Sequence, residues 1–126
     1  MKRITTLFAA AALALAVSVP AVLAKGGDGT RIVLKPAKAF PAAKGSAKLQ
    51  TKAGERQLEV EVEHVRRLAG TRVTFVVGGK KLGTAKVNAL GSAQIERRNA
   101  AVPAVRAGTA VSVRTAGGAQ IVRGSF

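Results

Sequence analysis

The segment Gln57–Glu63, with the sequence QLEVEVE, decides the fold. Aliphatic side chains stand at every second position of this segment, and glutamates stand between them. A period of two places the aliphatic residues on one face of a β-strand and the glutamates on the other. The acid-then-base run Glu61–Leu68 could instead form two helical turns, but the strict alternation favours a strand, which we expect to span Gln57–Val65.

The same strand signals recur along the chain at intervals of roughly ten residues. Further strands are expected at Ser46–Thr51, Thr71–Val77, Lys81–Val87, Ser92–Arg97, Thr109–Arg114 and Ala119–Arg123, with an eighth at Arg31–Leu34. The glycine pairs at 78–79 and 117–118 indicate hairpins, because glycine tolerates the positive φ of tight turns. This spacing predicts an all-β domain: a single small β-sandwich of seven to eight antiparallel strands with hairpin connections, with a small β-barrel as the alternative.

Residues 25–45, which precede most of these strands, are expected to lie outside the main domain. Residues 25–29 read KGGDG and have nothing to bury, and Pro36 and Pro41 cannot donate to a β-ladder. We therefore expect residues 25–45 to form a flexible tail and an edge segment with Phe40 against the core, and residues 46–126 to form the sandwich domain. Its core is expected to hold small branched side chains, namely Leu49, Leu58, Val60, Val62, Val73, Phe75, Val77, Leu82, Val87, Ile95, Val102, Val105, Val111, Val113, Ile121 and Phe126.

The first 24 residues have the layout of a secretory signal peptide. Lys2 and Arg3 form a charged start, an apolar run extends from Leu7 to Leu23, and a small-residue exit precedes Lys25. The alternative is a retained membrane anchor, but the run consists mostly of alanine and Pro20 interrupts its helix before the exit. We expect cleavage near Ala24, which leaves 102 of the 126 residues and lowers the formal charge from +15 to +13.

Composition places the mature domain in a bacterial envelope. An export leader, a small size and a chain rich in alanine, glycine, valine and arginine indicate a periplasmic or secreted bacterial protein. The absence of cysteine means that no disulfide supports the fold, so the domain depends on burial alone. A chain of this length suits one compact domain.

Catalytic and metal chemistry find little support in the sequence. His64 is the one imidazole, and its place after the alternating strand predicts a structural residue on the side of Leu58, Val60 and Val62 rather than a general base. Glu59, Glu61 and Glu63 share a strand face and could contribute to a cation site, but they fit better as a solvent face opposite basic residues of a neighbouring strand. The segment Gly78–Lys81 lacks the spacing of a phosphate loop. We expect no enzyme activity, no cofactor and no metal.

Charge is the remaining functional signal. Basic pairs lie at strand ends and turns, and they are the candidate anion-binding residues: Arg66, Arg67, Lys80, Lys81, Arg97 and Arg98. A field this positive attracts polyanions, but Tyr and Trp are absent, so stacked recognition of specific nucleic acid is not expected.

These signals predict an exported, non-enzymatic β-domain that acts as a binding or structural module of the bacterial envelope. One alternative is a protein that binds lipopolysaccharide, anionic glycan or nucleic acid through its charge. Another is an adhesin-like or assembly subunit that pairs through an open edge strand, with Lys81–Val87 and Ala119–Arg123 as the candidate edges. The predicted partners are anionic envelope polymers, besides the export machinery and inner membrane during transit.

Overall fold

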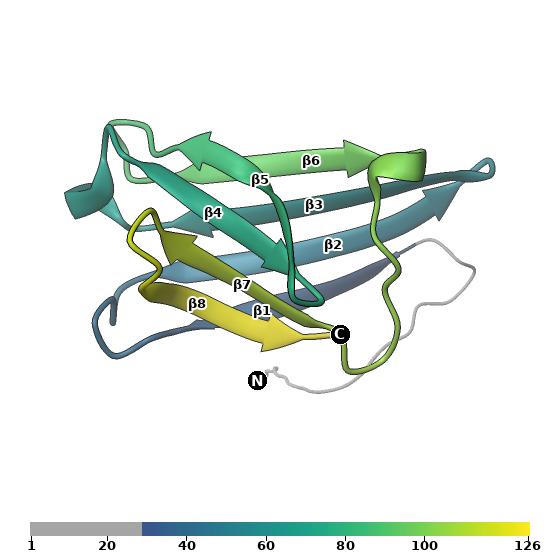
Figure 1. The fold of residues 1–126 in the computed structure, drawn as a ribbon, viewed down its shortest axis with the longest axis horizontal. Helices are drawn as coiled ribbons and strands as arrows, with labels where there is room; N and C mark the ends of the chain where they lie inside the picture. The colour runs from purple at the N-terminus through teal and green to yellow at the C-terminus, as the bar shows by residue number, and fades with distance from the viewer. Residues whose placement is uncertain (1–28) are drawn as a thin grey trace, which may run out of the picture.

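The computed structural model describes residues 29–126, which form eight β-strands and two short 3₁₀ helices (Figure 1). The strands are β1 (Thr30–Pro36), β2 (Lys44–Lys52), β3 (Glu55–Glu63), β4 (Arg72–Val77), β5 (Lys80–Lys86), β6 (Ala93–Arg98), β7 (Ala110–Thr115) and β8 (Gln120–Ser125). The 3₁₀ helices are η3 (Arg66–Leu68) and η4 (Asn99–Ala101). The expected signal peptide and its cleavage site lie outside the described residues. Within residues 29–126, no helix is long and apolar enough to cross a membrane.

All eight strands belong to one antiparallel sheet with the order β5-β4-β7-β8-β1-β2-β3-β6. The two end strands of this order, β5 and β6, lie side by side in Figure 1, so the sheet nearly closes into a barrel. The prediction of an all-β antiparallel domain is confirmed, and every strand begins and ends within two residues of its predicted bounds.

The sheet is not divided into the two separate layers that a sandwich would have, because β1 belongs to both halves. Its residues Thr30–Leu34 pair with β2, whereas Lys35 and Pro36 pair with β8. A first half (β1, β2, β3 and β6) is thereby continuous with a second half (β4, β5, β7 and β8), which lies in front of it in Figure 1. The barrel alternative describes this connection better than the sandwich.

β1 is also not the edge segment that was expected within residues 25–45, because it is paired on both sides. Two glycines explain how it crosses between neighbours. A Cβ on Gly45 of β2 would lie 3.0 Å from Leu34 Cβ, and a Cβ on Gly124 of β8 would lie 2.9 Å from Leu34 Cδ2. Because neither glycine has a side chain, there is room for Leu34 to be buried in the core at the point where β1 changes its pairing partner. The sheet therefore includes β1, which precedes Ser46.

The core lies between the two halves and consists of the inward side chains of every strand but β5. Phe75 is its largest fully buried side chain, and Phe40 is buried as expected. Most of the predicted core residues are buried, while Leu49, Leu82, Val105 and Phe126 are half-buried and pack against the core. The sequence prediction missed six buried hydrophobic residues, namely Leu34, Ala43, Ala47, Val65, Ala93 and Val122.

The end of β3 differs from the prediction at His64. The strand stops at Glu63, and His64 adopts a φ of 64°. This left-handed residue breaks the alternation, so Val65 is buried and the His64 side chain is exposed instead of lying beside Leu58. His64 borders a shallow depression of about 290 Å³ together with Phe40 and Arg67.

Of the two expected edge strands, one is internal. The segment Ala119–Arg123 falls largely in β8, which lies between β7 and β1. β5 does stand at the end of the order and faces β6 across a seam. At this seam a Cβ on Gly83 would clash with the Arg97 guanidinium and the end of Ile95. Inward-facing charge and lysines on an edge are devices that discourage strand addition, so the geometry does not favour the assembly alternative.

Candidate anion-binding surface

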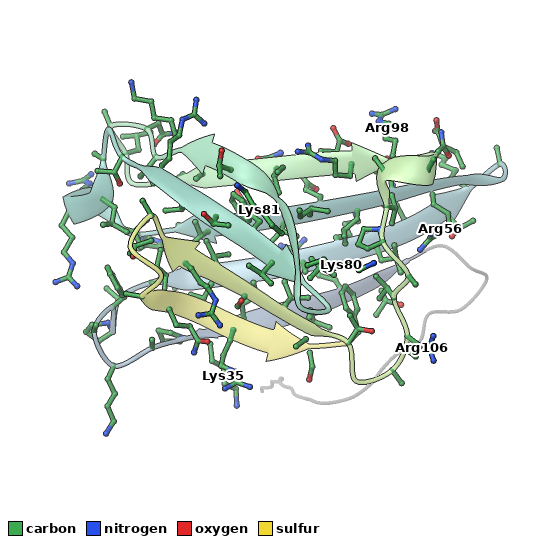
Figure 2. All side chains as sticks on the ribbon, viewed as in Figure 1. Lys35, Arg56, Lys80, Lys81, Arg98 and Arg106 are labelled. Atoms are coloured by element: carbon green, nitrogen blue, oxygen red, sulfur yellow. The ribbon has the colours of Figure 1, made fainter. Side chains whose placement is uncertain are left out.

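The six basic residues expected to bind anions are not gathered into one patch. Arg66 and Arg67 lie in η3, directly after β3, whereas Arg97 and Arg98 lie at the far end of β6. Because β3 and β6 are antiparallel, with Val62 opposite Ala93, these two pairs are separated by the length of β6. Lys80 and Lys81 begin β5 on the side of the barrel shown in front in Figure 2.

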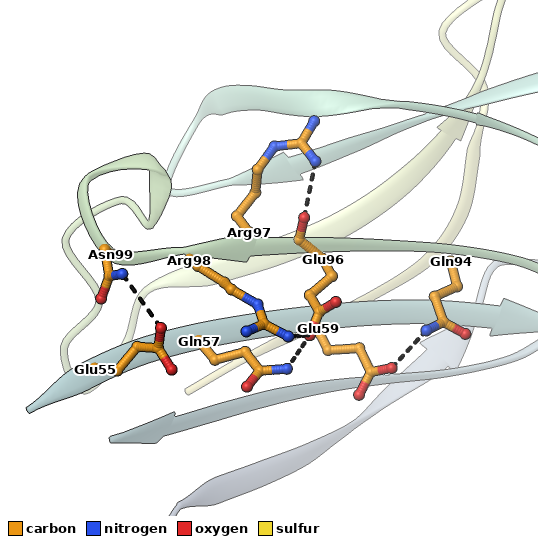
Figure 3. A network of polar contacts seen from close by, with 8 residues as sticks. All are labelled: Glu55, Gln57, Glu59, Gln94, Glu96, Arg97, Arg98 and Asn99. Atoms are coloured by element: carbon orange, nitrogen blue, oxygen red, sulfur yellow. Dashed lines mark hydrogen bonds and ion pairs between the residues drawn. The ribbon is translucent and has the colours of Figure 1, made fainter. Parts of the chain in front are cut away.

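Three of these arginines are already engaged within the fold. The Arg67 guanidinium lies 4.3 Å from the centroid of the Phe40 ring and donates to the carbonyl oxygen of Ala39. Arg98 Nη2 lies 3.4 Å from Glu96 Oε2 (Figure 3). Arg97 covers Gly83 at the seam and donates from Nη1 to the Glu96 carbonyl oxygen at 2.9 Å. These contacts fix the loop before β2 and the seam, and they reduce what the three side chains can offer a ligand.

The acidic side chains are segregated to one side of the barrel. Every side-chain carboxylate of residues 29–126 belongs to β3 or β6, namely Glu55, Glu59, Glu61, Glu63 and Glu96. In this range the second half of the sheet carries lysine and arginine but no acidic side chain. Since β3 and β6 are neighbours at one end of the strand order, the negative charge is concentrated on the first half.

The strand register collects basic and hydroxyl side chains on the outer surface of the second half. On β4 the residues Val73, Phe75 and Val77 are buried, so Arg72 and Thr74 point outward. Residues directly opposite one another share a face, and this places Lys86 beside Arg72, Arg114 and Thr84 beside Thr74, and Arg123 beside Ser112. We call this surface the acid-free face; it consists of Arg72, Thr74, Lys81, Thr84, Lys86, Arg114 and Arg123, while Ser112 is buried.

The acid-free face offers well-spaced donors. Neighbouring strands lie about 4.8 Å apart, so charges on adjacent strands lie within reach of successive anionic groups on a polymer. Arg72 Nη1 donates to Thr84 Oγ1 at 3.2 Å, and Arg114 Nη1 donates to the Gly118 carbonyl oxygen at 3.3 Å. Each guanidinium has five N–H donors, so most of them stay available to phosphate, sulfate or carboxylate oxygens.

The sequence prediction named Lys81 but not the other four basic residues of this face. Neighbours in the sequence, such as Lys80 and Lys81, alternate between the two sides of a strand, whereas residues far apart in the sequence meet through the register. The alternation of Arg72, Thr74 and Val76 with buried residues was the available signal, but the strand order that joins it to β7 and β8 was not.

The glutamates of β3 lie on its outer side, as expected. Glu59 is directly opposite Lys48 of β2, and Glu63 is directly opposite Lys44, which confirms the predicted basic neighbours for two of the three glutamates. Among residues 29–126, no three histidine, aspartate or glutamate side chains are grouped so that they could hold a metal ion.

Glu61, in the middle of this row, has a raised pKa. Burial is the main cause, followed by a hydrogen bond with Glu63 and by the charges of Glu63 and Glu59, while Arg31 acts in the opposite direction. A carboxyl whose pKa is higher in the folded state lowers stability when it is ionised, and this penalty disappears as the pH falls through that pKa. The neutral residues Ser46 and Gln94 stand opposite Glu61 on β2 and β6.

We therefore expect the Glu61→Gln variant to melt at a higher temperature than the wild type at pH 7. At pH 3.5, below the unfolded value of 4.5, the carboxyl is neutral in both states and the two proteins should melt at the same temperature. Thermal denaturation followed by circular dichroism at both pH values measures the difference. A variant that is less stable at pH 7 would contradict the penalty assigned to Glu61.

Comparison with known proteins returns no family model, no curated protein and no solved structure that matches the chain. Function is therefore inferred from the charge distribution and the side-chain geometry described above.

Proposed function

We propose that this protein is an exported, non-enzymatic binding module of the bacterial envelope, and that its acid-free face binds anionic polymers such as lipopolysaccharide or acidic glycans. The observation that carries the proposal is the segregation of all five described side-chain carboxylates to β3 and β6. A polyanion that approaches the second half meets five basic side chains and no repelling acidic side chain. Thr74 and Thr84 add hydroxyl groups that hydrogen-bond to anionic oxygens.

Affinity on such a surface comes from charge neutralisation and counterion release. Binding should therefore weaken steeply as salt is added, and the steepness should report how many basic residues contact the polymer. We expect no contribution from stacking, because Phe40 and Phe75 are buried, Phe126 packs against the core, and the chain has no Tyr or Trp. The ligand class is accordingly defined by charge density and not by base sequence.

The test compares two triple variants with the same loss of charge. The first, Arg72→Gln/Lys86→Gln/Arg114→Gln, removes three cations from the acid-free face. The second, Arg31→Gln/Lys44→Gln/Lys48→Gln, removes three from the first half. Heparin serves as the probe, and its affinity is measured across a salt series. We expect the first variant to bind heparin at least tenfold more weakly than the wild type at about 0.15 M salt. The slope of log K against log salt should become less steep by about two to three.

The control variant should retain most of its affinity, because its altered residues lie on the opposite half of the barrel. Equal losses in the two variants would show that net charge alone attracts the polymer and would remove the case for a defined binding face. Lipopolysaccharide in place of heparin then tests whether an envelope polymer is bound in the same way.

A further inference from the structure

The outer surface of the first half is divided into a basic part and an acidic part. Its outward residues on β1 and β2 include Arg31, Lys44 and Lys48, and no acid lies among them. Its outward residues on β3 and β6 carry the described side-chain carboxylates. The boundary between the two parts runs between β2 and β3, along the strands.

One cross-strand row shows the division completely. Arg31 is opposite Lys48, Lys48 is opposite Glu59, and Glu59 is opposite Glu96. The row therefore reads basic, basic, acidic, acidic across four strands. In a second row, Lys44 is opposite Glu63.

This arrangement is unfavourable for an isolated molecule, because like charges directly opposite one another destabilise a sheet. Arg31 stands beside Lys48, and Glu59 stands beside Glu96. Two glutamines relieve the acidic side: Gln94 Nε2 donates to Glu59 Oε2 at 2.6 Å, and Gln57 donates to Glu96 (Figure 3). On the basic side, Lys48 stands opposite Glu59 and the charge of Arg31 acts on Glu61, but neither basic residue forms an ion pair, since the one ion pair within residues 29–126 joins Arg98 to Glu96.

The same surface carries an exposed apolar side chain. Val33 is 75% exposed, the largest exposure of any large hydrophobic residue in the described range. It borders an open groove of about 440 Å³, which Lys35, Lys44, Glu61 and Glu63 also line. Burial of Val33 would add apolar contact to a surface that is otherwise charged.

We propose that a second copy of this chain packs face to face on the outer surface of the first half, related by a twofold axis that runs parallel to the strands between β2 and β3. This rotation reverses the strand order and keeps each row at its level along the strands. Arg31 then faces Glu96 of the second copy, and Lys48 faces Glu59 of the second copy. Each contact occurs twice, as an interface with twofold symmetry requires.

The charge pattern favours this axis over a twofold axis perpendicular to the strands. A twofold axis perpendicular to the strands would place β1 on β1 and β6 on β6, so like charges would meet. The surface on which the two copies face each other is small. From the spacing of its four strands it is on the order of 400 Å² per copy, which is below the size of a standard interface. The dimer is therefore weak and reversible, and it forms at high local concentration.

Two single substitutions and their mixture test the proposal. Arg31→Glu places an acid opposite Glu96 of the second copy, and Glu96→Lys places a base opposite its Arg31. Sedimentation equilibrium of the purified protein between about 10 µM and 1 mM, at about 0.15 M salt, should show a dimer for the wild type. Each variant alone should dissociate at least tenfold more readily, and an equimolar mixture of the two should regain the wild-type association.

The two variants distinguish loss of this interface from loss of the fold and from a change in net charge. Within one molecule Arg31→Glu sets an acid beside Lys48, and Glu96→Lys sets a base beside Glu59 but removes the ion pair with Arg98. Melting curves of each variant verify that the fold is kept. The substitutions shift the net charge in opposite directions, so net repulsion cannot explain two losses. Arg72→Glu, on the acid-free face, is the matched control and should not weaken the dimer. A monomeric wild type at 1 mM, or a mixture that fails to associate, overturns the proposal.

Discussion

Replacing Phe75 with alanine is expected to lower the free energy of unfolding by about 3–5 kcal/mol. Phe75 lies in the middle of β4, is fully buried, and is the largest side chain with no exposure. The surrounding core consists mostly of valine, which has little freedom to move into the space that the ring would leave. Because a domain of this size is stable by only about 5–15 kcal/mol, the loss would remove a large part of its stability.

Phe126→Ala is the matched control for this prediction. It removes the same atoms, but Phe126 is half-buried at the end of the chain and packs on the margin of the core. We expect a loss of about 1–2 kcal/mol, since less apolar surface is withdrawn from the core. Urea denaturation of the two variants and the wild type measures both values. Similar losses would mean that the core is not centred on Phe75.

The strands could be predicted from the sequence because alternation is a local signal. Leu58, Val60 and Val62 define which side of β3 faces inward, and no knowledge of its neighbours is needed. The hairpin at Gly78-Gly79 was equally local, and both residues have the positive φ values, 60° and 81°, that the prediction required.

The closure of the sheet could not be predicted in this way, because alternation does not say which strands are neighbours. β1 pairs with β8, almost ninety positions later in the chain, and the glycines that permit this contact, Gly45 and Gly124, do not stand out in the sequence. Their role is visible only when Leu34 lies between them. The sandwich and the barrel share the same strand pattern and differ in this contact.

The candidate binding residues were missed for a related reason. The prediction relied on charges adjacent in the sequence, and adjacency in a strand separates side chains onto opposite faces. Arg97 and Arg98 illustrate this, since one covers the seam at Gly83 and the other pairs with Glu96 on the outer side. Arg72 and Arg114 lie far apart in the sequence, but Arg114 of β7 is opposite Thr74, which is two residues along β4 from Arg72.

The two proposals are compatible in space. The acid-free face and the proposed dimer surface lie on opposite halves of the barrel, so association through the first half would leave two acid-free faces pointing outward. When one copy of the dimer binds a polymer, the second copy is held close to the same polymer. The resulting high local concentration favours binding by both copies. Failure of the dimer test would remove this bivalency but leave the binding face intact. The heparin comparison judges that face separately when it is made below the protein concentrations at which the dimer forms, because its control variant alters Arg31 and Lys48 of the proposed dimer surface.

Gly91 is the second position where a single substitution should have a large effect. It lies in the turn between β5 and β6, is buried, and has a φ of 85°. A Cβ there would lie 2.6 Å from the backbone nitrogen of Arg66, and the Gly91 carbonyl accepts a hydrogen bond from the Val65 N–H at 3.0 Å. Alanine would add left-handed strain of about 1–2 kcal/mol and push η3 away from the turn, for a total loss of about 2–5 kcal/mol.

Gly70→Ala separates these two contributions, because Gly70 has the same φ of 85° but no atom within 4 Å of the added Cβ. It should lose only the strain of about 1–2 kcal/mol. Chemical denaturation of both variants therefore yields the cost of the contact with Arg66 by difference. If the two glycines prove equally sensitive, the turn before β6 is not packed against η3 as closely as the distances state. A larger loss at Gly91 would establish that η3 depends on this turn, because the backbone of Arg66 leaves no room for a side chain there.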